Sequence, residues 1–370
     1  MTTHFPDLLQ KSPCRDTFFF GGTNMNENQP KFLTPDYASD FQCISGKCRH
    51  SCCIGWEIDI DDETWHRYRN VPGKIGEKLS AFIAPPEKDC PAHFILREQE
   101  RCPFLNEQNL CELILTLGED SLCDICREHP RFYNRIGGNL EMGLGLCCEE
   151  ASRLLFARKD PIRLLSSDLS DPSGEGSSDP AEEGAFETDE YGSAFDPLLL
   201  KLRGEVFSLL QDRTKTLEGR ISAIRARFYL PESPTGISFW GDFFETLERL
   251  DPAWEKEIDR MKNGHADLSS FRAFMEKEDR TAEYENFLWY LFYRHLASSY
   301  DEDSFATYLQ LCILFLHILE YLGACRLSEN GSFSKEEQIE LARMFSSEIE
   351  YSDENIERIT DLLLERELIL

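Results

Sequence analysis

The cysteines of this chain are concentrated in one part of the sequence. Eleven of the fourteen fall between Cys43 and Cys148. The densest group has the spacing Cys43-x4-Cys48-x3-Cys52-Cys53, and a Cys-x2-Cys pair and a Cys-Cys pair follow. Thiolates at such short spacing suit a soft metal ion or an iron–sulfur cluster, and paired thiols also suit a disulfide framework. The cellular compartment decides between these two interpretations.

The bulk of the sequence favours metal binding over disulfides. At 370 residues the chain is long enough to bury full cores in two domains, whereas disulfide scaffolds are typical of small secreted domains. Residues 1–40 are polar and have no apolar segment after a basic one, so we expect no secretory signal. We therefore expect a cytoplasmic protein with reduced, metal-binding thiols. An extracellular disulfide protein stays as an alternative.

The charge of the chain excludes some classes of partner. Its formal net charge is −29, whereas nucleic acid binding and attraction to anionic membranes both need a basic surface. The longest apolar stretch, residues 311–316 with a short extension, is far below the roughly 20 residues of a membrane span. We therefore expect no nucleic acid and no membrane partner. An acidic surface attracts lysine-bearing proteins, although solubility explains the charge equally well.

Composition and hydrophobic spacing divide the chain into four parts. We expect an N-terminal arm over residues 1–40, a cysteine-rich cluster-binding domain over 41–165, an acidic disordered insert over 166–197 and a helical domain over 198–370. The insert is too poor in apolar residues to offset the entropy of ordering. Apolar residues at three- and four-residue spacing predict helices over residues 198–210, 217–228 and 239–250. Residues 283–298 and 305–322 are apolar on most faces, so we expect central core helices there. The expected fold is mainly α with minor β, with the metal-binding part before the helices.

Several common nucleotide and metal motifs are missing. The sequence contains no G-x-G-x-x-G after a strand, no P-loop and no H-E-x-x-H. The radical S-adenosylmethionine spacing C-x3-C-x2-C fails because Gly55 stands at the third cysteine position. A cluster here therefore need not perform radical chemistry. Free cysteines also pack as small apolar residues, and we expect this for Cys14, Cys90, Cys312 and Cys325. The interpretation of Cys123 and Cys148 stays open.

Six segments together resemble the flagellin lysine N-methylases. They are residues 40–60 (DFQCISGKCRHSCCIGWEIDI), 102–105 (CPFL) followed by 110–111 (LC) and 117–119 (LGE), 126–131 (CREHPR), 147–149 (CCE), 285–294 (ENFLWYLFYR) and 345–355 (FSSEIEYSDEN). The third segment matches the C-x3-P-R signature of that family. In the fourth, Cys148 stands where the family has proline, which leaves Cys147 as the family cysteine. The resemblance covers nearly the whole chain except the arm and the acidic insert.

The resemblance implies an activity and its cofactors. It implies transfer of a methyl group from S-adenosylmethionine to lysine side chains of flagellin, and an iron–sulfur cluster of the [4Fe-4S] type, with zinc as the alternative. Matching the family motifs gives eight candidate ligands: Cys43, Cys48, Cys52, Cys53, Cys102, Cys111, Cys126 and Cys147. A single cubane takes four cysteines, so either half of these are not ligands or there are two centres. The competing function is a non-catalytic zinc- or iron-chelating or electron-transfer protein, which would not need residues 198–370.

Lysine methylation sets the chemistry expected of the site. The attacking amine must be neutral although the pKa of free lysine is about 10.4, and a carboxylate, a tyrosine hydroxyl or a desolvated channel can deliver that state. The candidate catalytic residues lie in the family-like C-terminal segments: Tyr293, Glu348 and Glu350. The candidate cofactor-binding residues are Trp56, Arg131, Arg294, Ser352 and Asn355. The two arginines suit the carboxylate of the methyl donor. Helix capping and core packing are the alternative roles of the three catalytic candidates. The arginines could equally neutralise this acidic protein's own carboxylates or the charge of a thiolate-bound cluster.

Overall fold

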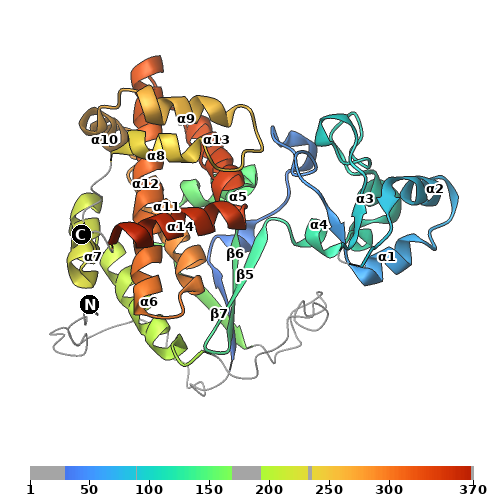
Figure 1. Ribbon diagram of the computed structural model, residues 1–370, viewed down its shortest axis with the longest axis horizontal. Helices are drawn as coiled ribbons and strands as arrows, with labels where there is room; N and C mark the ends of the chain where they lie inside the picture. The colour runs from blue at the N-terminus through green and yellow to red at the C-terminus, as the bar shows by residue number, and fades with distance from the viewer. Residues whose placement is uncertain (1–29, 89, 169–192, 232–235, 368–370) are drawn as a thin grey trace.

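The computed structural model describes residues 30–88, 90–168, 193–231 and 236–367 and has two lobes of unequal size (Figure 1). The small lobe has a core that includes or contacts five cysteines, and the large lobe contains a sheet and most of the helices. Helices predominate, so the predicted mainly α fold with minor β is confirmed. Residues 1–29 of the predicted arm and 169–192 of the predicted insert lie outside the described residues. The four predicted domain limits stay predictions.

Short elements surround an apolar core in the small lobe. They are β2 (Asp59–Ile60), α1 (Asp62–Tyr68), α2 (Gly73–Phe82), β3 (Ile83–Ala84), β4 (Ala92–Phe94), α3 (Glu112–Leu117) and α4 (Asp124–Glu128). Phe94 and Phe104 lie in this core and are 2% and 0% exposed. Asp61 accepts hydrogen bonds from the backbone N–H of Thr64 (2.8 Å) and of Asp124 (3.0 Å). One carboxylate therefore caps α1 and also holds the first residue of α4.

A four-stranded sheet in the order β5-β6-β1-β7 belongs to the large lobe. Its strands are β1 (Lys31–Pro35), β5 (Arg131–Ile136), β6 (Asn139–Leu144) and β7 (Leu164–Asp168). β5 and β6 form a hairpin through Gly137 and Gly138, whose φ angles of 57° and 80° favour glycine. β1 is parallel to β6 and antiparallel to β7. Residues 31–35, which belong to the predicted arm, therefore form a central strand with a partner on each side. Both partner strands lie more than 100 residues away in the chain.

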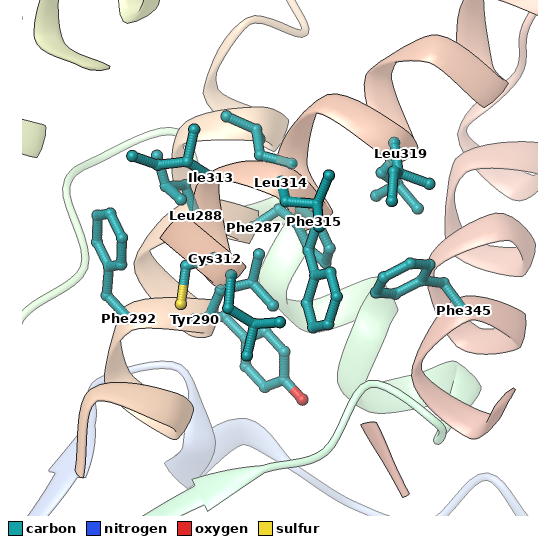
Figure 2. Packing of buried hydrophobic residues seen from close by; sticks show 14 of the residues in the cluster. Phe287, Leu288, Tyr290, Phe292, Cys312, Ile313, Leu314, Phe315, Leu319 and Phe345 are labelled. Carbon is teal, nitrogen blue, oxygen red and sulfur yellow. The ribbon is translucent and has the colours of Figure 1, made fainter. Parts of the chain in front are cut away.

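The helices of the large lobe form one continuous core. They are α5 (Glu149–Ala157), α6 (Asp196–Leu210), α7 (Leu217–Phe228), α8 (Ile237–Phe244), α9 (Trp254–Asn263), α10 (Leu268–Lys277), α11 (Ala282–His295), α12 (Glu302–Asn330), α13 (Lys335–Phe345) and α14 (Asp353–Glu367). Figure 2 shows Phe345 of α13 beside Phe315 of α12, and Phe345 also contacts Phe287 of α11; all three are fully buried. β6 and α5 also contribute to this core. The segment predicted as the cysteine-rich domain is therefore shared between the two lobes.

Helix α12 passes the length and hydropathy test for a membrane span, which the sequence analysis did not foresee. It has 29 residues, and 78% of its apolar window is buried inside the protein. Core helices of water-soluble proteins pass the same test. The burial of α12 is that of a core helix, because it packs against α9, α10, α11, α13 and α14.

One buried ion pair connects the sheet to the helices. Arg203 of α6 donates to both carboxylate oxygens of Glu141 in β6, each at 2.9 Å, and both side chains are at most 4% exposed. The Arg203 guanidinium also lies 5.8 Å from the ring centroid of Tyr293 in α11. Each of these buried charges has lost its hydration, and only the opposite charge of its partner compensates for that loss.

We predict that Arg203→Met destabilises the protein by about 3–5 kcal/mol, because it leaves the Glu141 carboxylate buried without a partner. Urea unfolding followed by circular dichroism measures this. The matched control is Arg163→Met, since Arg163 is 79% exposed and stands 4.0 Å from its partner Asp36. The control should change stability by less than about 1 kcal/mol. Equal losses in the two variants would contradict the assignment.

Candidate functional site: a buried polar cluster and two groups of thiols

A polar cluster lies inside the large lobe where α11 ends beside residues 346–350. Glu350 is its centre: Oε1 stands 2.8 Å from Nε2 of His295, and Oε2 accepts a hydrogen bond from the Tyr290 hydroxyl at 3.2 Å. Arg294 donates to the Tyr290 hydroxyl (3.3 Å) and to the Glu350 backbone carbonyl (3.2 Å). Glu350, His295 and Tyr290 are buried, with 3%, 6% and 0% exposure. The cluster therefore joins two predicted residues, Glu350 and Arg294, with two that were not predicted.

Local helix geometry brings these residues together. Tyr290 and Arg294 are four residues apart on α11 and so lie on one face of the helix. Glu350 is the last residue of a π-helical turn, Ser346–Glu350, that follows α13 directly. Single π-helical turns are rare and often occur at functional sites. The turn places the Glu350 carboxylate against the C-terminal end of α11.

The charges of the cluster balance internally. Burial alone would raise the pKa of Glu350, but the hydrogen bond with His295 and the charge of Arg294 lower it overall. Burial lowers the pKa of His295, against the effect of Glu350. The pKa of Arg294 is raised, because Tyr290 and Glu350 outweigh burial. The consistent state is an anionic Glu350, a cationic Arg294 and a neutral His295 that donates its Nε2–H to the carboxylate.

Tyr351 connects the polar cluster to the protein surface. Its ring lies 4.7 Å from the Arg294 guanidinium, and the ring of Phe132 lies 4.8 Å from the same group. Tyr351 is 39% exposed. A Cβ atom at Gly145 would stand 2.1 Å from the Tyr351 hydroxyl, so glycine is required there. Burial raises the pKa of Cys147 to about 12 despite a hydrogen bond with Tyr351.

Three predicted residues instead hold a loop before α9. Glu348 accepts hydrogen bonds from the backbone N–H of Leu250 (2.9 Å) and of Asp251 (2.8 Å). Asn355 donates to the carbonyls of residues 248 and 348 at 3.1 and 2.8 Å. Ser352 caps the start of α14 through the Asn355 N–H at 3.3 Å. These are the capping roles named as the alternative in the sequence analysis.

The other predicted residues lie apart from the cluster. The Tyr293 hydroxyl is 3.2 Å from the carbonyls of Leu33 and Met142, so it joins α11 to β1 and β6. Trp56 donates from Nε1 to the Cys52 carbonyl at 2.6 Å. Arg131 lies 5.6 Å from the ring centroid of Phe41 and forms no ion pair with any described residue. Of the two predicted arginines, only Arg131 therefore keeps its charge uncommitted within the described chain.

The eight candidate cysteines separate into two groups of four. One group packs in or against the small-lobe core: Cys53, Cys102, Cys111 and Cys126. The other four lie outside that core: Cys43, Cys48, Cys52 and Cys147. Cys43, Cys48 and Cys52 each lie close enough to Cys148 for their charges to interact. The two cysteines left open join one group each, since Cys123 is 1% exposed in the small-lobe core and Cys148 packs against the large-lobe core.

The thiols are of the type that binds a metal, but their side chains are not arranged around a metal site. Burial raises the pKa of Cys102 to about 12, and the nearby thiols of Cys53, Cys111 and Cys123 act in the same direction. A bound cation would reverse this effect, because thiolates are the ligand form. Within the described residues, however, no three His, Cys, Asp or Glu side chains are arranged to hold a metal ion. The thirteen described cysteines are free thiols. The type and number of donors fit a cubane cluster, and binding one would require the thiol side chains of this core to turn toward a common point.

His295, Tyr290 and Tyr351 were missed by sequence reasoning. All three lie in or directly beside the segments that carry the family resemblance. The available signal was polar and ionisable residues within α11, whose other positions are almost all buried and apolar. Because buried ionisable groups need partners, such a segment predicts an internal polar cluster even when the partners are unknown.

Comparisons with known proteins point to one family. The model of the family described as the FliB lysine N-methylase C-terminal domain matches residues 236–369. Two relatives named lysine-N-methylase, from Salmonella choleraesuis and Salmonella typhimurium, are 27% and 25% identical over 144 and 134 residues. Each match covers 35% of this chain and 33% of the relative. The flagellar biosynthetic protein FliU of Salmonella muenchen is 25% identical over 35% of this chain and 79% of its own length. No solved structure matches the chain.

The matched region contains α8 to α14 and therefore most of the polar cluster, including Arg294, His295 and Glu350. This C-terminal part of the chain is similar to the C-terminal domain of lysine N-methylases, which agrees with the family resemblance inferred from the sequence. The matched part is about a third of the length of the two Salmonella lysine-N-methylases.

We predict that Glu350→Gln destabilises the protein by about 3–5 kcal/mol, because the Arg294 guanidinium then stays buried without its carboxylate. The folded-state pKa of Glu350 is depressed, so the wild-type advantage is present above the ordinary value of 4.5 and is lost as pH falls below it. Urea unfolding at several pH values measures both effects. Glu329→Gln is the control, since Glu329 is 43% exposed in its pair with Arg260. A Glu350 variant as stable as this control would contradict the assignment.

Proposed function

We propose that this chain is a cytoplasmic protein-lysine N-methyltransferase that acts on flagellin and uses S-adenosylmethionine as the methyl donor. The observation that carries the proposal is the family match over residues 236–369, together with relatives named lysine-N-methylase and FliU. The buried charged cluster supports it, because the cluster lies in the matched region and reaches the surface at Tyr351. A non-catalytic chelating protein would have no use for such a domain.

The proposed reaction is a displacement in which positioning matters most. The lysine nitrogen bonds to the methyl carbon, and the carbon–sulfur bond breaks with its electron pair leaving on sulfur. Glu350 binds Arg294, and the Arg294 guanidinium packs against the ring of Tyr351. We therefore assign Glu350 to orienting the protein surface at Tyr351. Tyr293 and Glu348 are assigned to holding the strands and the α9 loop, because their polar atoms bind backbone groups.

We assign the carboxylate of the donor to Arg131. Its guanidinium is uncommitted among the described ion pairs, whereas the Arg294 guanidinium is committed to Tyr290 and Glu350. A charge-assisted hydrogen bond to a carboxylate contributes about 1.5–3 kcal/mol. Arg131 lies at the first position of β5, directly after the C-x3-P segment of the family resemblance.

We predict that the purified protein methylates flagellin lysines with S-adenosylmethionine alone, and that Arg131→Gln raises the KM for the donor about 10- to 100-fold with less effect on kcat. Mass spectrometry of flagellin and initial rates at varied donor concentration measure this. The control is Arg135→Gln, on the same strand and exposed. A requirement for one-electron reduction, with release of 5′-deoxyadenosine, would contradict the polar mechanism.

We also propose a [4Fe-4S] cluster held by the small-lobe thiols Cys53, Cys102, Cys111 and Cys126. They are the four candidate ligands that share one core, and a cubane takes four cysteines. When bound, the cluster would supply a rigid centre for a lobe whose elements are short. The backbone supports the set, since Cys102 N–H donates to the Cys53 carbonyl at 2.9 Å.

We predict that anaerobically purified protein contains about four iron and four sulfide per chain, and that Cys102→Ser removes the visible absorption of the cluster. Metal analysis and absorption spectroscopy measure this. Cys312→Ser is the control, because Cys312 is buried in α12 and is not one of the candidate ligands. If the analysis finds stoichiometric zinc and no iron, the result contradicts the iron–sulfur cluster and supports a zinc site.

A further inference from the structure

Two adjacent residues of the cysteine-rich loop, Arg49 and His50, contact carboxylates of two different helices in the large lobe. Arg49 donates from its backbone N–H to Oε2 of Glu149 (2.9 Å) and from Nε to Oε1 (3.0 Å). The thiol of Cys48 is 3.6 Å from Oε2 of the same carboxylate. Glu149 is the first residue of α5, and its side chain is 14% exposed. One carboxylate therefore binds three groups of the loop.

The second contact is made by His50. Its Nε2 lies 2.8 Å from Oε2 of Glu340 in α13. Glu340 also accepts hydrogen bonds from Arg343, at 2.9 and 3.2 Å, and is 19% exposed. Burial alone would raise the pKa of Glu340, but the hydrogen bonds from His50 and Arg343 lower it to about 2. Glu340 is therefore a fixed anion facing the loop.

Helices α5 and α13 pack against each other, and the loop lies beside both (Figure 1). We propose that Glu149 and Glu340 form a two-point clasp, defined by the pairs Arg49–Glu149 and His50–Glu340, that docks the loop of residues 43–53 onto the large lobe. The two carboxylates are positioning residues. The clasp sets where the thiols of this loop stand relative to the Cys147-Cys148 corner before α5.

The clasp has a consequence for the thiols. Cys48 and Cys52 flank Arg49 and His50, whereas Cys148 immediately precedes Glu149. Burial raises the pKa of Cys48 to about 11, and both Glu149 and Cys148 act in the same direction, as expected for groups held close together. Docking therefore gathers thiols from both lobes at one place. The clasp itself needs no methyl donor, so it stands independently of the proposed methyl transfer.

The competing explanation is that the clasp contributes nothing. Exposed ion pairs often add little stability, and Arg49 and His50 are 47% and 40% exposed. The lobes are also joined covalently through the segments before β2 and after α4. The two explanations differ in what happens to the loop itself when the carboxylates are neutralised, since loss of docking opens the loop without unfolding either lobe.

Limited trypsin digestion of the full chain tests the clasp, because Lys47 and Arg49 are exposed cleavage sites within the loop. We expect Glu149→Gln and Glu340→Gln each to speed cleavage at these sites about two- to fivefold, and the double variant about tenfold. Hydrogen exchange of residues 45–54, read by mass spectrometry, should accelerate in the same order. Glu205→Gln is the control, since its pair with Arg227 lies between α6 and α7.

Salt dependence of the wild-type protein gives a second, mutation-free test. Raising ionic strength from about 0.05 to 1 M shortens the Debye length to about 3 Å. Higher salt should leave the rate at which trypsin cleaves a peptide standard unchanged. Cleavage of the loop in the wild-type protein should accelerate toward the rate of the double variant. The proposal is overturned if the double variant keeps wild-type cleavage and exchange in the loop, or if wild-type cleavage does not respond to salt.

Discussion

Charged side chains on α11 fix how the large lobe is assembled. A buried charge without a partner costs several kcal/mol, so each must find its counter-charge wherever the chain can supply one. Arg294 and His295 fix the π-helical turn through Glu350, and Glu285 of the same helix binds Arg213 at 2.9 Å and Arg220 at 2.7 Å. Tyr293 fixes the strands on the same helix. The turn, the sheet and α7 all take their places relative to α11.

Acidic residues therefore have two different tasks in this protein. The net charge of −29 implies a surface rich in carboxylates, yet several of the buried ones are paired with arginine. Glu141 has Arg203, and Glu257 has Arg260 and Arg326. The clasp at Glu149 and Glu340 uses the same pairing at the junction of the lobes. Net charge alone describes the solvated carboxylates and says nothing about these anchors.

The sequence predicted what depends on local spacing and not what depends on distant pairing. The helices expected over residues 198–210, 217–228 and 305–322 are confirmed as α6, α7 and α12, because helical spacing in the first two and a long run that is apolar on most faces in the third are local properties. The helix expected over 239–250 ends at Phe244. β1 was missed since its partners are far away in the chain, and Glu350 could be named but not joined to His295, 55 residues earlier.

The division of the thiols bears on how many metal centres the chain can hold. In sequence, Cys52 and Cys53 read as one ligand pair, but Cys53 packs with the small-lobe core while Cys52 is exposed outside that core. A hydrogen bond between the two thiols lowers the pKa of Cys53 and raises that of Cys52. Neighbouring cysteines in the sequence therefore have different surroundings in the fold, and a ligand set drawn from one core would include Cys53 without Cys52.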